Sequence, residues 1–212
     1  MSQEYKIRTK NPDVFLRVQK GHFATMHSHT NYYIDCTTQK YRLSEAKAVA
    51  KQMVTDYRSN TIIDTIICID GTEVIGAFLA QELTDANFMN LNAHRTVYVM
   101  SPEFVGGGQM IFRDNTIPMI KGKHVLILAA SVTTGKSALA AIDAIKYYGG
   151  YIVGVSAIFA TVSQCDGHAV YSIFNPNDMG DFESAKPHEC PMCARGEKLE
   201  ALVNSYGCSR LA

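Results

Sequence analysis

Apolar residues along this chain alternate between a helical spacing and runs of strand length. Residues 43–57 carry apolar side chains three and four positions apart, which predicts an amphipathic helix with Ser44 as its N-cap. Residues 61–69 form an isoleucine-rich run that indicates a buried strand, and residues 73–83 return to a helical pattern. The first half of the chain therefore predicts strand and helix in turn.

Shorter apolar segments occupy the middle of the chain. Residues 96–100 and 109–112 are expected to be short strands on either side of a glycine-rich loop at residues 101–108. Residues 114–122 contain a proline and a glycine, and we expect them to form a connection.

The alternation continues in the second half. A β-branched run at residues 125–128 predicts a strand, residues 129–136 form a loop of small residues, and residues 137–148 have a helical pattern. Further strands are expected at residues 151–160 and 170–174. Because the β-α-β order recurs, we expect an α/β fold with a mostly parallel central sheet and helices on both faces.

Composition narrows the class of protein. The 212 residues are 47% hydrophobic and 19% charged, which excludes a disordered or fibrous chain and predicts a single domain over residues 1–212. The formal net charge is zero and no basic run occurs, so nucleic-acid binding is not expected. No apolar run approaches the ~18 residues of a membrane span. The N-terminus also lacks a signal-peptide pattern, so we expect a cytoplasmic protein with no membrane partner.

The loop before the helix at residues 137–148 has the features of a phosphate site. A strand leads into it, and the free N–H groups and dipole of the following helix favour an anion. Hydroxyl groups and a lysine add further donors. The candidate phosphate-binding residues are Thr133, Thr134, Gly135, Lys136 and Ser137.

A second loop follows a buried strand at the same edge of the predicted sheet. Ligands of such sheets bind at the carboxyl ends of the strands, and a glycine permits close approach of the backbone. The candidate residues are Asp70, Gly71, Thr72 and Glu73. Two anion-accepting loops side by side suit a ligand with phosphates at both ends. An ordinary strand–helix turn with Thr72 as N-cap is the alternative.

Residues 130–137 fit two phosphate-binding motifs. Read as ASVTTGKS, they satisfy a relaxed Walker A pattern, in which Lys136 reaches the nucleotide phosphates and Ser137 binds magnesium. That pattern favours a P-loop ATP-binding protein. The same segment also resembles the loop of type I phosphoribosyltransferases that binds 5-phosphoribosyl 1-diphosphate (PRPP). That loop is an apolar strand, two acidic residues, two spacers and Thr-Thr-Gly-x-Thr, and residues 133–135 match its core.

The resemblance extends along the chain in family order. Residues 21–35 (GHFATMHSHTNYYID) are similar to the base-binding region of orotate phosphoribosyltransferases. Residues 69–83 resemble the pyrophosphate loop and its helix, and residues 122–150 the PRPP loop with its strand and helix. This order favours the phosphoribosyltransferase over the P-loop protein. A P-loop protein would also need a later apolar strand that ends in an aspartate, the Walker B motif, and the sequence has none. The base-binding candidates that the resemblance supplies are Phe23, His27, Ser28 and Asn31.

The resemblance implies a type I phosphoribosyltransferase fold with a small hood region from the N-terminal and C-terminal parts of the chain. It implies a glycosyltransferase of pyrimidine biosynthesis and nucleotide metabolism that moves phosphoribose from PRPP to a pyrimidine-like base, with Mg²⁺ on the pyrophosphate. The small-molecule ligand would be PRPP or a nucleotide monophosphate. It also implies a homodimer in which the mobile loop of one subunit reaches the site of the other.

Two departures from the family pattern affect the chemical step. Ala129 and Ala130 occupy the positions of the acidic pair that holds the ribose hydroxyls of PRPP. The loop at residues 100–109 contains Glu103 and no basic residue, whereas the family's mobile loop carries lysine and histidine. Because both losses weaken stabilisation of the transition state, the catalytic residues stay unassigned.

These departures leave three readings open. A divergent transferase would recruit other groups to the pyrophosphate and the ribose. A non-catalytic phosphoribosyl-ligand-binding or regulatory protein would keep only the phosphate cradle. In the third reading, the same pocket catalyses a different reaction. The replacement candidates are Arg95, Arg113 and Lys123 for the pyrophosphate, and Asp70 and Glu73 for the ribose.

The tail at residues 186–212 carries a second chemical signal. Cys190 and Cys193 form a Cys-x2-Cys pair, which is half of a zinc site. The candidates for its completion are Cys165, His168 and Cys208. The histidines of the base-binding region, which are expected to contact either the base or a metal, are His22, His27 and His29. A small zinc element and a packing element of buried thiols both fit this tail.

Overall fold

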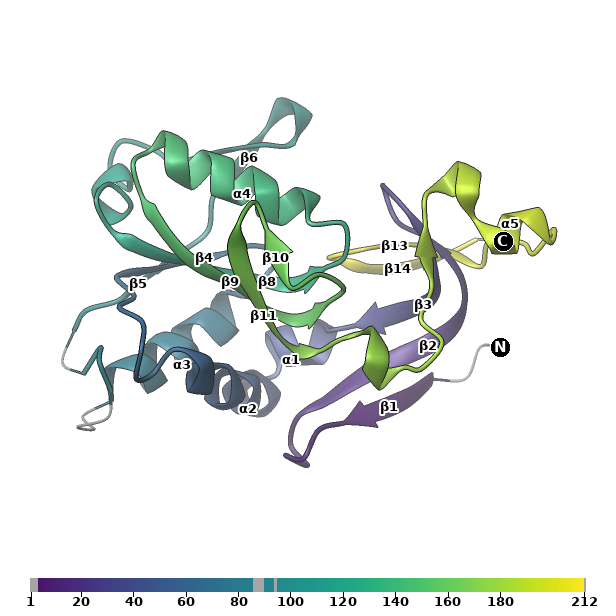
Figure 1. Ribbon diagram of the computed structural model, residues 1–212, viewed down its shortest axis with the longest axis horizontal. Helices are drawn as coiled ribbons and strands as arrows, with labels where there is room; N and C mark the ends of the chain where they lie inside the picture. Colours follow the sequence, from purple (N-terminus) through teal and green to yellow (C-terminus); the bar gives the residue numbers. More distant parts are fainter. Residues whose placement is uncertain (1–3, 86–89, 94, 212) are drawn as a thin grey trace.

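The computed structural model describes residues 4–85, 90–93 and 95–211. Its central sheet has the order β10-β11-β9-β8-β4-β5, and every neighbouring pair is parallel except β10 and β11 (Figure 1). The strands are β4 (Thr65–Cys68), β5 (Tyr98–Met100), β8 (His124–Val132), β9 (Tyr151–Ala160), β10 (Gln164–Cys165) and β11 (His168–Phe174). The expected mostly parallel sheet is confirmed.

Helices cover both faces of the central sheet (Figure 1). The helices are α1 (Thr37–Tyr41), α2 (Leu43–Met53), α3 (Glu73–Thr84), α4 (Lys136–Tyr147) and α5 (Pro191–Ala194). Ile66 packs in the core that contains α2 and α3, whereas its neighbour Ile67 packs in the core that contains α4. Successive side chains of a strand point to opposite faces, so a sheet covered twice needs unbroken apolar runs. This explains the isoleucine-rich sequence of β4.

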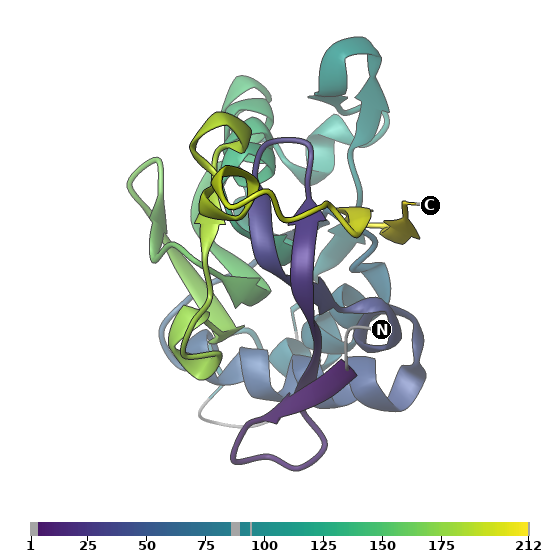
Figure 2. The same ribbon diagram turned by 90° about the vertical axis from the view of Figure 1, so that its right-hand side faces the viewer.

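A second sheet forms the hood. Its order is β12-β3-β2-β13-β14, and β1 pairs with residues 15–19 of β2, before the part of β2 that pairs with β13. The strands are β1 (Glu4–Arg8), β2 (Phe15–Ala24), β3 (His29–Asp35), β12 (Ser184–Ala185), β13 (Ala201–Asn204) and β14 (Gly207–Arg210). The C-terminal β13 pairs in parallel with the N-terminal β2, and Figure 2 shows the tail crossing the β2–β3 hairpin. Both ends of the chain therefore build the hood, as the resemblance implied.

Several local expectations need correction. Helix α2 ends at Met53 and continues as a short 3-10 helix, and Arg42 rather than Ser44 holds its N-cap position. The predicted glycine-rich loop at residues 101–108 contains a strand, β6 (Glu103–Val105), which pairs with β7 (Gln109–Ile111), the strand predicted at residues 109–112. The 3-10 helices are η1 (Val54–Asp56), η2 (Gly106–Gly108), η3 (Ile117–Met119), η4 (Pro176–Asp178) and η5 (Pro187–Glu189).

The phosphate loop is also shorter than predicted. Strand β8 extends to Val132, so Ala129 and Ala130 lie within the strand and are buried. Strand β9 pairs with β8 as far as Val132, and this pairing holds the added residues in the sheet. The loop is therefore confined to residues 133–135.

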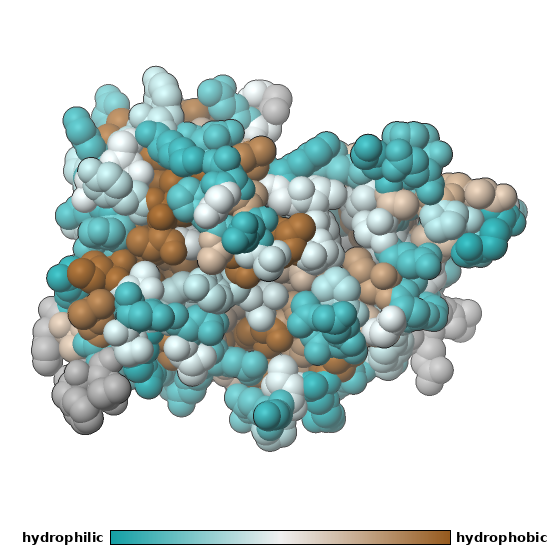
Figure 3. All heavy atoms as spheres, viewed as in Figure 1, coloured by the Kyte–Doolittle hydropathy of each residue, from teal (hydrophilic) through white to brown (hydrophobic). Residues whose placement is uncertain are grey.

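No helix within the described ranges is long and apolar enough to cross a membrane. Hydrophilic residues cover much of the face drawn in Figure 3, and apolar residues are more frequent on the half formed by the central sheet and its helices.

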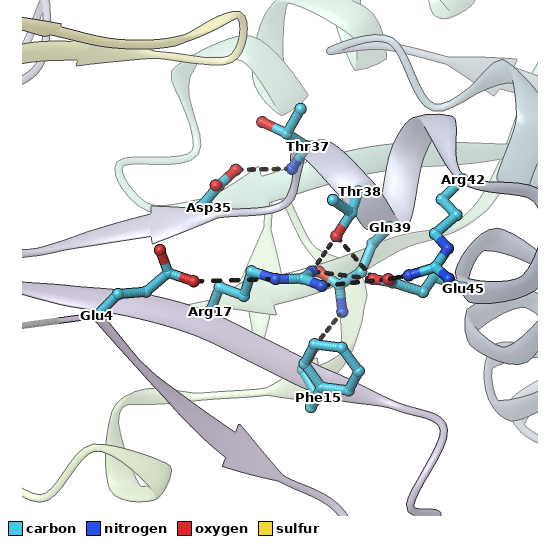
Figure 4. A network of polar contacts seen from close by, with 9 residues as sticks. All are labelled: Glu4, Phe15, Arg17, Asp35, Thr37, Thr38, Gln39, Arg42 and Glu45. Carbon is cyan, nitrogen blue, oxygen red and sulfur yellow. Dashed lines mark hydrogen bonds and ion pairs between the residues drawn. The ribbon is translucent and has the colours of Figure 1, made fainter.

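An ion pair joins the hood to α2 (Figure 4). The Arg17 guanidinium of β2 donates to both carboxylate oxygens of Glu45, at 3.0 and 3.2 Å, and the Thr38 hydroxyl donates to the same carboxylate at 2.7 Å. Burial raises the pKa of Glu45, but the hydrogen bonds from Arg17 and Thr38 outweigh it and hold that pKa below its ordinary value. The pair therefore stabilises the fold above the ordinary carboxyl pKa, and this stabilisation is lost as pH falls through the lowered pKa.

We expect Glu45→Gln to lower the free energy of unfolding at pH 7 by about 3 kcal/mol, because the Arg17 guanidinium, whose side chain is only 14% exposed, would lose its carboxylate partner. Urea denaturation measures the difference, which should shrink at acid pH. The matched control is Glu4→Gln, which removes a half-exposed partner 4.0 Å from Arg17 and should change stability by less than about 1 kcal/mol. Equal effects of the two substitutions would contradict this role.

Candidate functional site

A pocket of about 260 Å³ lies between the carboxyl edge of the central sheet and the hood. Its walls come from the β2–β3 turn, strand β3, the loop after β4, the loop after β8, the segment before β12 and the β13–β14 turn. The lining residues are Thr25, Met26, His27, Ser28, Thr30, Tyr32, Tyr33, Ile34, Asp70, Ser131, Thr133, Thr134, Ser137, Phe182, Ser184, Val203, Asn204 and Ser205. Parts of three segments singled out in the sequence thus meet in one cavity.

The phosphate-loop candidates divide into two groups. Thr133, Thr134 and Ser137 line the pocket, whereas Lys136 is exposed and lies outside the lining. Gly135 adopts a left-handed φ of 73° before α4, and no side chain caps the helix N-terminus. Free backbone N–H groups and hydroxyls at a helix start are a site for an anion. The hydroxyls and the helix N-terminus, rather than the lysine, therefore form the pocket wall.

Only one residue of the second loop faces the pocket. Asp70 lines it and adopts a left-handed φ of 61°. The Thr72 hydroxyl donates to the carbonyls of Ile69 and Leu128 instead of capping α3, which ties the loop to β8. Glu73 is exposed and accepts a hydrogen bond from Ser101 at 2.5 Å.

Next to Asp70 lies a buried cation. Lys40 of α1 is 2% exposed, and its Nζ donates to the Asp70 carbonyl at 2.9 Å and to the Ser205 carbonyl at 2.5 Å. Burial raises the pKa of the Asp70 carboxyl, and the charge of Lys40 opposes that rise. Lys40 therefore joins the second loop to the β13–β14 turn, two segments that each contribute residues to the pocket.

The base-binding candidates are only partly placed in the pocket. His27 and Ser28 line it, but Phe23 is buried in a separate cluster with Tyr33. Asn31 donates to the Asp181 carbonyl at 2.6 Å and accepts from the Glu183 backbone at 2.7 Å. Phe23 and Asn31 are therefore structural in this conformation.

The basic residues considered for the pyrophosphate lie outside the pocket lining. The Arg113 guanidinium forms a two-pronged pair with Glu103 on the β6–β7 hairpin, with N–O distances of 2.7 and 2.6 Å. Arg95 forms an ion pair with Asp64, with Arg95 Nη1 3.5 Å from Asp64 Oδ1. Lys123 is also absent from the lining.

The cysteines of the tail approach two histidines of the hood. The ligand atoms of His22, His29, Cys190 and Cys193 all lie within 4.8 Å of one another. The sequence candidates for this completion, Cys165, His168 and Cys208, are not part of the group, and His27 lines the pocket instead. The Cys-x2-Cys pair and the hood histidines were thus two halves of one cluster, brought together by the folding of the tail onto β2.

Sequence reasoning missed Lys40 and the β13–β14 turn. Lys40 lies in an ordinary polar stretch, and nothing in its local pattern indicates a buried amine. Asn204 ends the short strand β13 and Ser205 follows it, and the partner of that strand, β2, is nearly 180 positions earlier in the chain. Only the tertiary pairing brings them to the pocket.

Comparison with known proteins finds relatives that match most of the chain. No family model matches the chain. The orotate phosphoribosyltransferase of Sulfurimonas denitrificans is 26% identical over 193 residues, covering 84% of this chain and 89% of its own. That of Chlorobium phaeobacteroides is 25% identical over 188 residues, covering 86% of each.

Solved structures agree at the level of the fold. The orotate phosphoribosyltransferase of Mycobacterium tuberculosis H37Rv in complex with PRPP aligns with a TM-score of 0.52 at 16% identity, over 70% of this chain and 83% of that one. The UMP synthase of Leishmania donovani aligns with a TM-score of 0.56 at 15% identity, over 76% of this chain and 34% of that one. The strand order, the position of the pocket and these similarities agree: the chain has a type I phosphoribosyltransferase fold and is similar over most of its length to orotate phosphoribosyltransferases.

Proposed function

We propose that this protein binds a phosphoribosyl ligand in the pocket and transfers phosphoribose from PRPP to a pyrimidine-like base. The observation that carries the proposal is that three parts of the chain meet in one cavity: the hydroxyl residues of the phosphate loop, the loop after β4 and the β2–β3 turn. The residues concerned are Thr133, Thr134, Ser137, Asp70, His27 and Ser28. In the resembled family these segments serve the 5′-phosphate, the pyrophosphate and the base. The PRPP complex of the related M. tuberculosis enzyme supports the same ligand class.

The 5′-phosphate is assigned to the start of α4. Thr133, Thr134 and Ser137 offer hydroxyl donors, and the uncapped helix end offers backbone N–H groups. The Thr161 hydroxyl donates to the Thr133 carbonyl at 2.6 Å, which ties the loop to the end of β9. A cradle fixed in advance loses little conformational freedom on binding.

The base is assigned to the hood side of the pocket. His27 and Ser28 offer hydrogen-bonding groups, and Tyr33 and Phe182 offer aromatic surface. A planar heterocycle with several polar edges needs both kinds of contact. A pyrimidine-like base fits this mixture.

Magnesium has one candidate carboxylate among the described lining residues. Mg²⁺ is usually held by one or two carboxylates together with substrate phosphates and water, and Asp70 would supply the protein ligand. Bound with PRPP, the ion would neutralise charge on the pyrophosphate leaving group. The Ala129 and Ala130 side chains offer no oxygen for the ribose hydroxyls. Asp70 is therefore the one carboxylate among the described lining residues of the pocket.

A non-catalytic ligand-binding or regulatory protein is the second candidate. Two observations favour it. The alanines of β8 are buried, and the charge of Arg113, just after the β6–β7 hairpin, is already paired with Glu103. The P-loop ATP-binding alternative has little support, because Lys136 lies outside the pocket and the fold is that of a phosphoribosyltransferase.

A homodimer is part of the proposal. The β6–β7 hairpin projects from the central-sheet part of the molecule (Figure 1), and its Phe104 is 55% exposed. A second copy would cover this hairpin, as in the resembled family. Sedimentation at micromolar concentration should give a dimer that Phe104→Ser weakens. A monomer under these conditions would contradict the assembly and leave the ligand assignment intact.

We expect Thr134→Val to weaken binding of PRPP with magnesium about tenfold, because a charge-assisted hydrogen bond to phosphate contributes on the order of 1.5 kcal/mol or more. Calorimetric titration measures the affinity, with ATP and magnesium as the comparator that should not bind. Thr55→Val, at an exposed threonine of η1, is the matched control. Unchanged affinity in Thr134→Val would overturn the assignment of the phosphate cradle.

The reaction is tested separately from binding. The wild-type protein should release pyrophosphate from PRPP in the presence of orotate and magnesium, and Asp70→Asn should abolish most of that release. Without its carboxylate, the pocket would hold magnesium and pyrophosphate less well. Binding of PRPP without any pyrophosphate release would reject the transferase and favour the non-catalytic protein.

A further inference from the structure

Four metal-ligating side chains converge outside the pocket. His22 lies in β2, His29 begins β3, Cys190 precedes α5 and Cys193 lies within it. Both cysteines are free thiols, and Cys190 and His22 are only 3% and 2% exposed. Burial of polar side chains lowers the stability of the fold unless they form hydrogen bonds or bind a metal ion.

The distances match a tetrahedral centre. His22 Nε2 and His29 Nδ1 are 3.3 Å apart, and the Cys190 and Cys193 sulfurs lie 3.5 and 3.7 Å from His22 Nε2. Cys193 Sγ lies 3.2 Å from His29 Nδ1. A tetrahedral zinc with ordinary bond lengths requires about 3.3 Å between nitrogens and about 3.6 Å between nitrogen and sulfur. An ion therefore fits with movements of a few tenths of an ångström.

The orientation of His22 is also that of a ligand. Its Nδ1 lies 2.9 Å from the Glu197 carbonyl oxygen, which can only accept a hydrogen bond. Nδ1 therefore donates the proton, and Nε2 presents its lone pair to the cluster. A backbone carbonyl on the far nitrogen is the usual support of a metal-binding histidine. Two thiolates and two imidazoles are a donor set typical of structural zinc.

The cluster joins two walls of the pocket. Residues 25–28, which line the pocket, form the turn between His22 and His29. The tail runs from Cys193 to β13, and the Glu200 backbone donates to the His22 carbonyl at 2.8 Å. The β13–β14 turn then supplies Asn204 and Ser205 to the opposite wall.

We propose that His22, His29, Cys190 and Cys193 bind one Zn²⁺, and that this ion fastens the C-terminal tail to the β2–β3 hairpin. The ion thereby holds the two hood walls of the pocket in register. This site stands on its own ligands and does not depend on which phosphorylated compound the pocket accepts.

Metal content tests the site directly. The reduced, purified protein should contain about one zinc per chain, or take up one when Zn²⁺ is added. Co²⁺ in its place should give the thiolate charge-transfer absorption of a tetrahedral sulfur site. Cys193→Ser and His29→Ala should lose most of the metal, whereas the control Cys208→Ser, at an exposed cysteine outside the cluster, should keep it.

Wild-type protein that neither contains nor takes up zinc, or that carries a stable Cys190–Cys193 disulfide in its active form, would overturn the proposal. The cobalt titration uses wild-type protein, so it remains decisive if a variant fails to fold.

The fastening role has its own readout. Chelation should speed tryptic cleavage at Arg195 and Lys198, which are exposed residues of the tail, by an order of magnitude or more, and Zn²⁺ should restore protection. Cleavage at the same rate with and without zinc would reject the fastening role. Loss of zinc with no change in PRPP affinity would reject the link between the ion and the pocket walls.

Discussion

Backbone pairing between β2 and β13 is the contact on which the pocket depends. It aligns Phe23 with Ala201 and Ala24 with Leu202, and so brings the last strands of the chain beside the second. Without it, the β13–β14 turn would not reach the carboxyl edge of the central sheet. Two short parallel hydrogen-bonded segments are a weak link alone. The small apolar cluster that includes the paired residues Phe23 and Ala201, together with the nearby Cys/His group, explains how so short a contact holds.

The chemistry of the site follows from what the central sheet presents at that edge. Strand β8 delivers hydroxyls and a helix start after Val132, but alanines before it, whereas the loop after β4 delivers the single carboxylate of Asp70. Tight binding of PRPP in the ground state requires only the hydroxyls and the helix start that follow β8. Acceleration of the transfer requires groups that respond to charge developing in the transition state. Affinity for PRPP and rate of transfer are therefore expected to be separable in this protein.

Local patterns in the sequence were enough for the central sheet and its helices. The periodicity of α2 and α4 and the apolar runs of β4, β8 and β9 are local signals, and the predicted elements are present with shifted ends. The strand end at Val132 was misjudged because alanine and serine carry no strong preference, and pairing with β9 decided it.

The hood could not be derived in the same way. Its sheet joins segments from both ends of the chain, and no local period reports which strands will pair. The same reason hid the role of Lys40, whose partners are carbonyls of residues 70 and 205, and the ligand role of His22 and His29, whose partners lie in the tail. The family resemblance located the phosphate loop, but the exposure of Lys136 emerged only from the fold.

Hydrogen exchange of the backbone with and without PRPP and magnesium is the most direct test of the central claim. The pocket assignment predicts protection at residues 133–137 and at the β13–β14 turn on addition of PRPP, because both contribute to the pocket walls. Protection confined to other segments, or no change at residues 133–137, would contradict a phosphoribosyl site in this pocket.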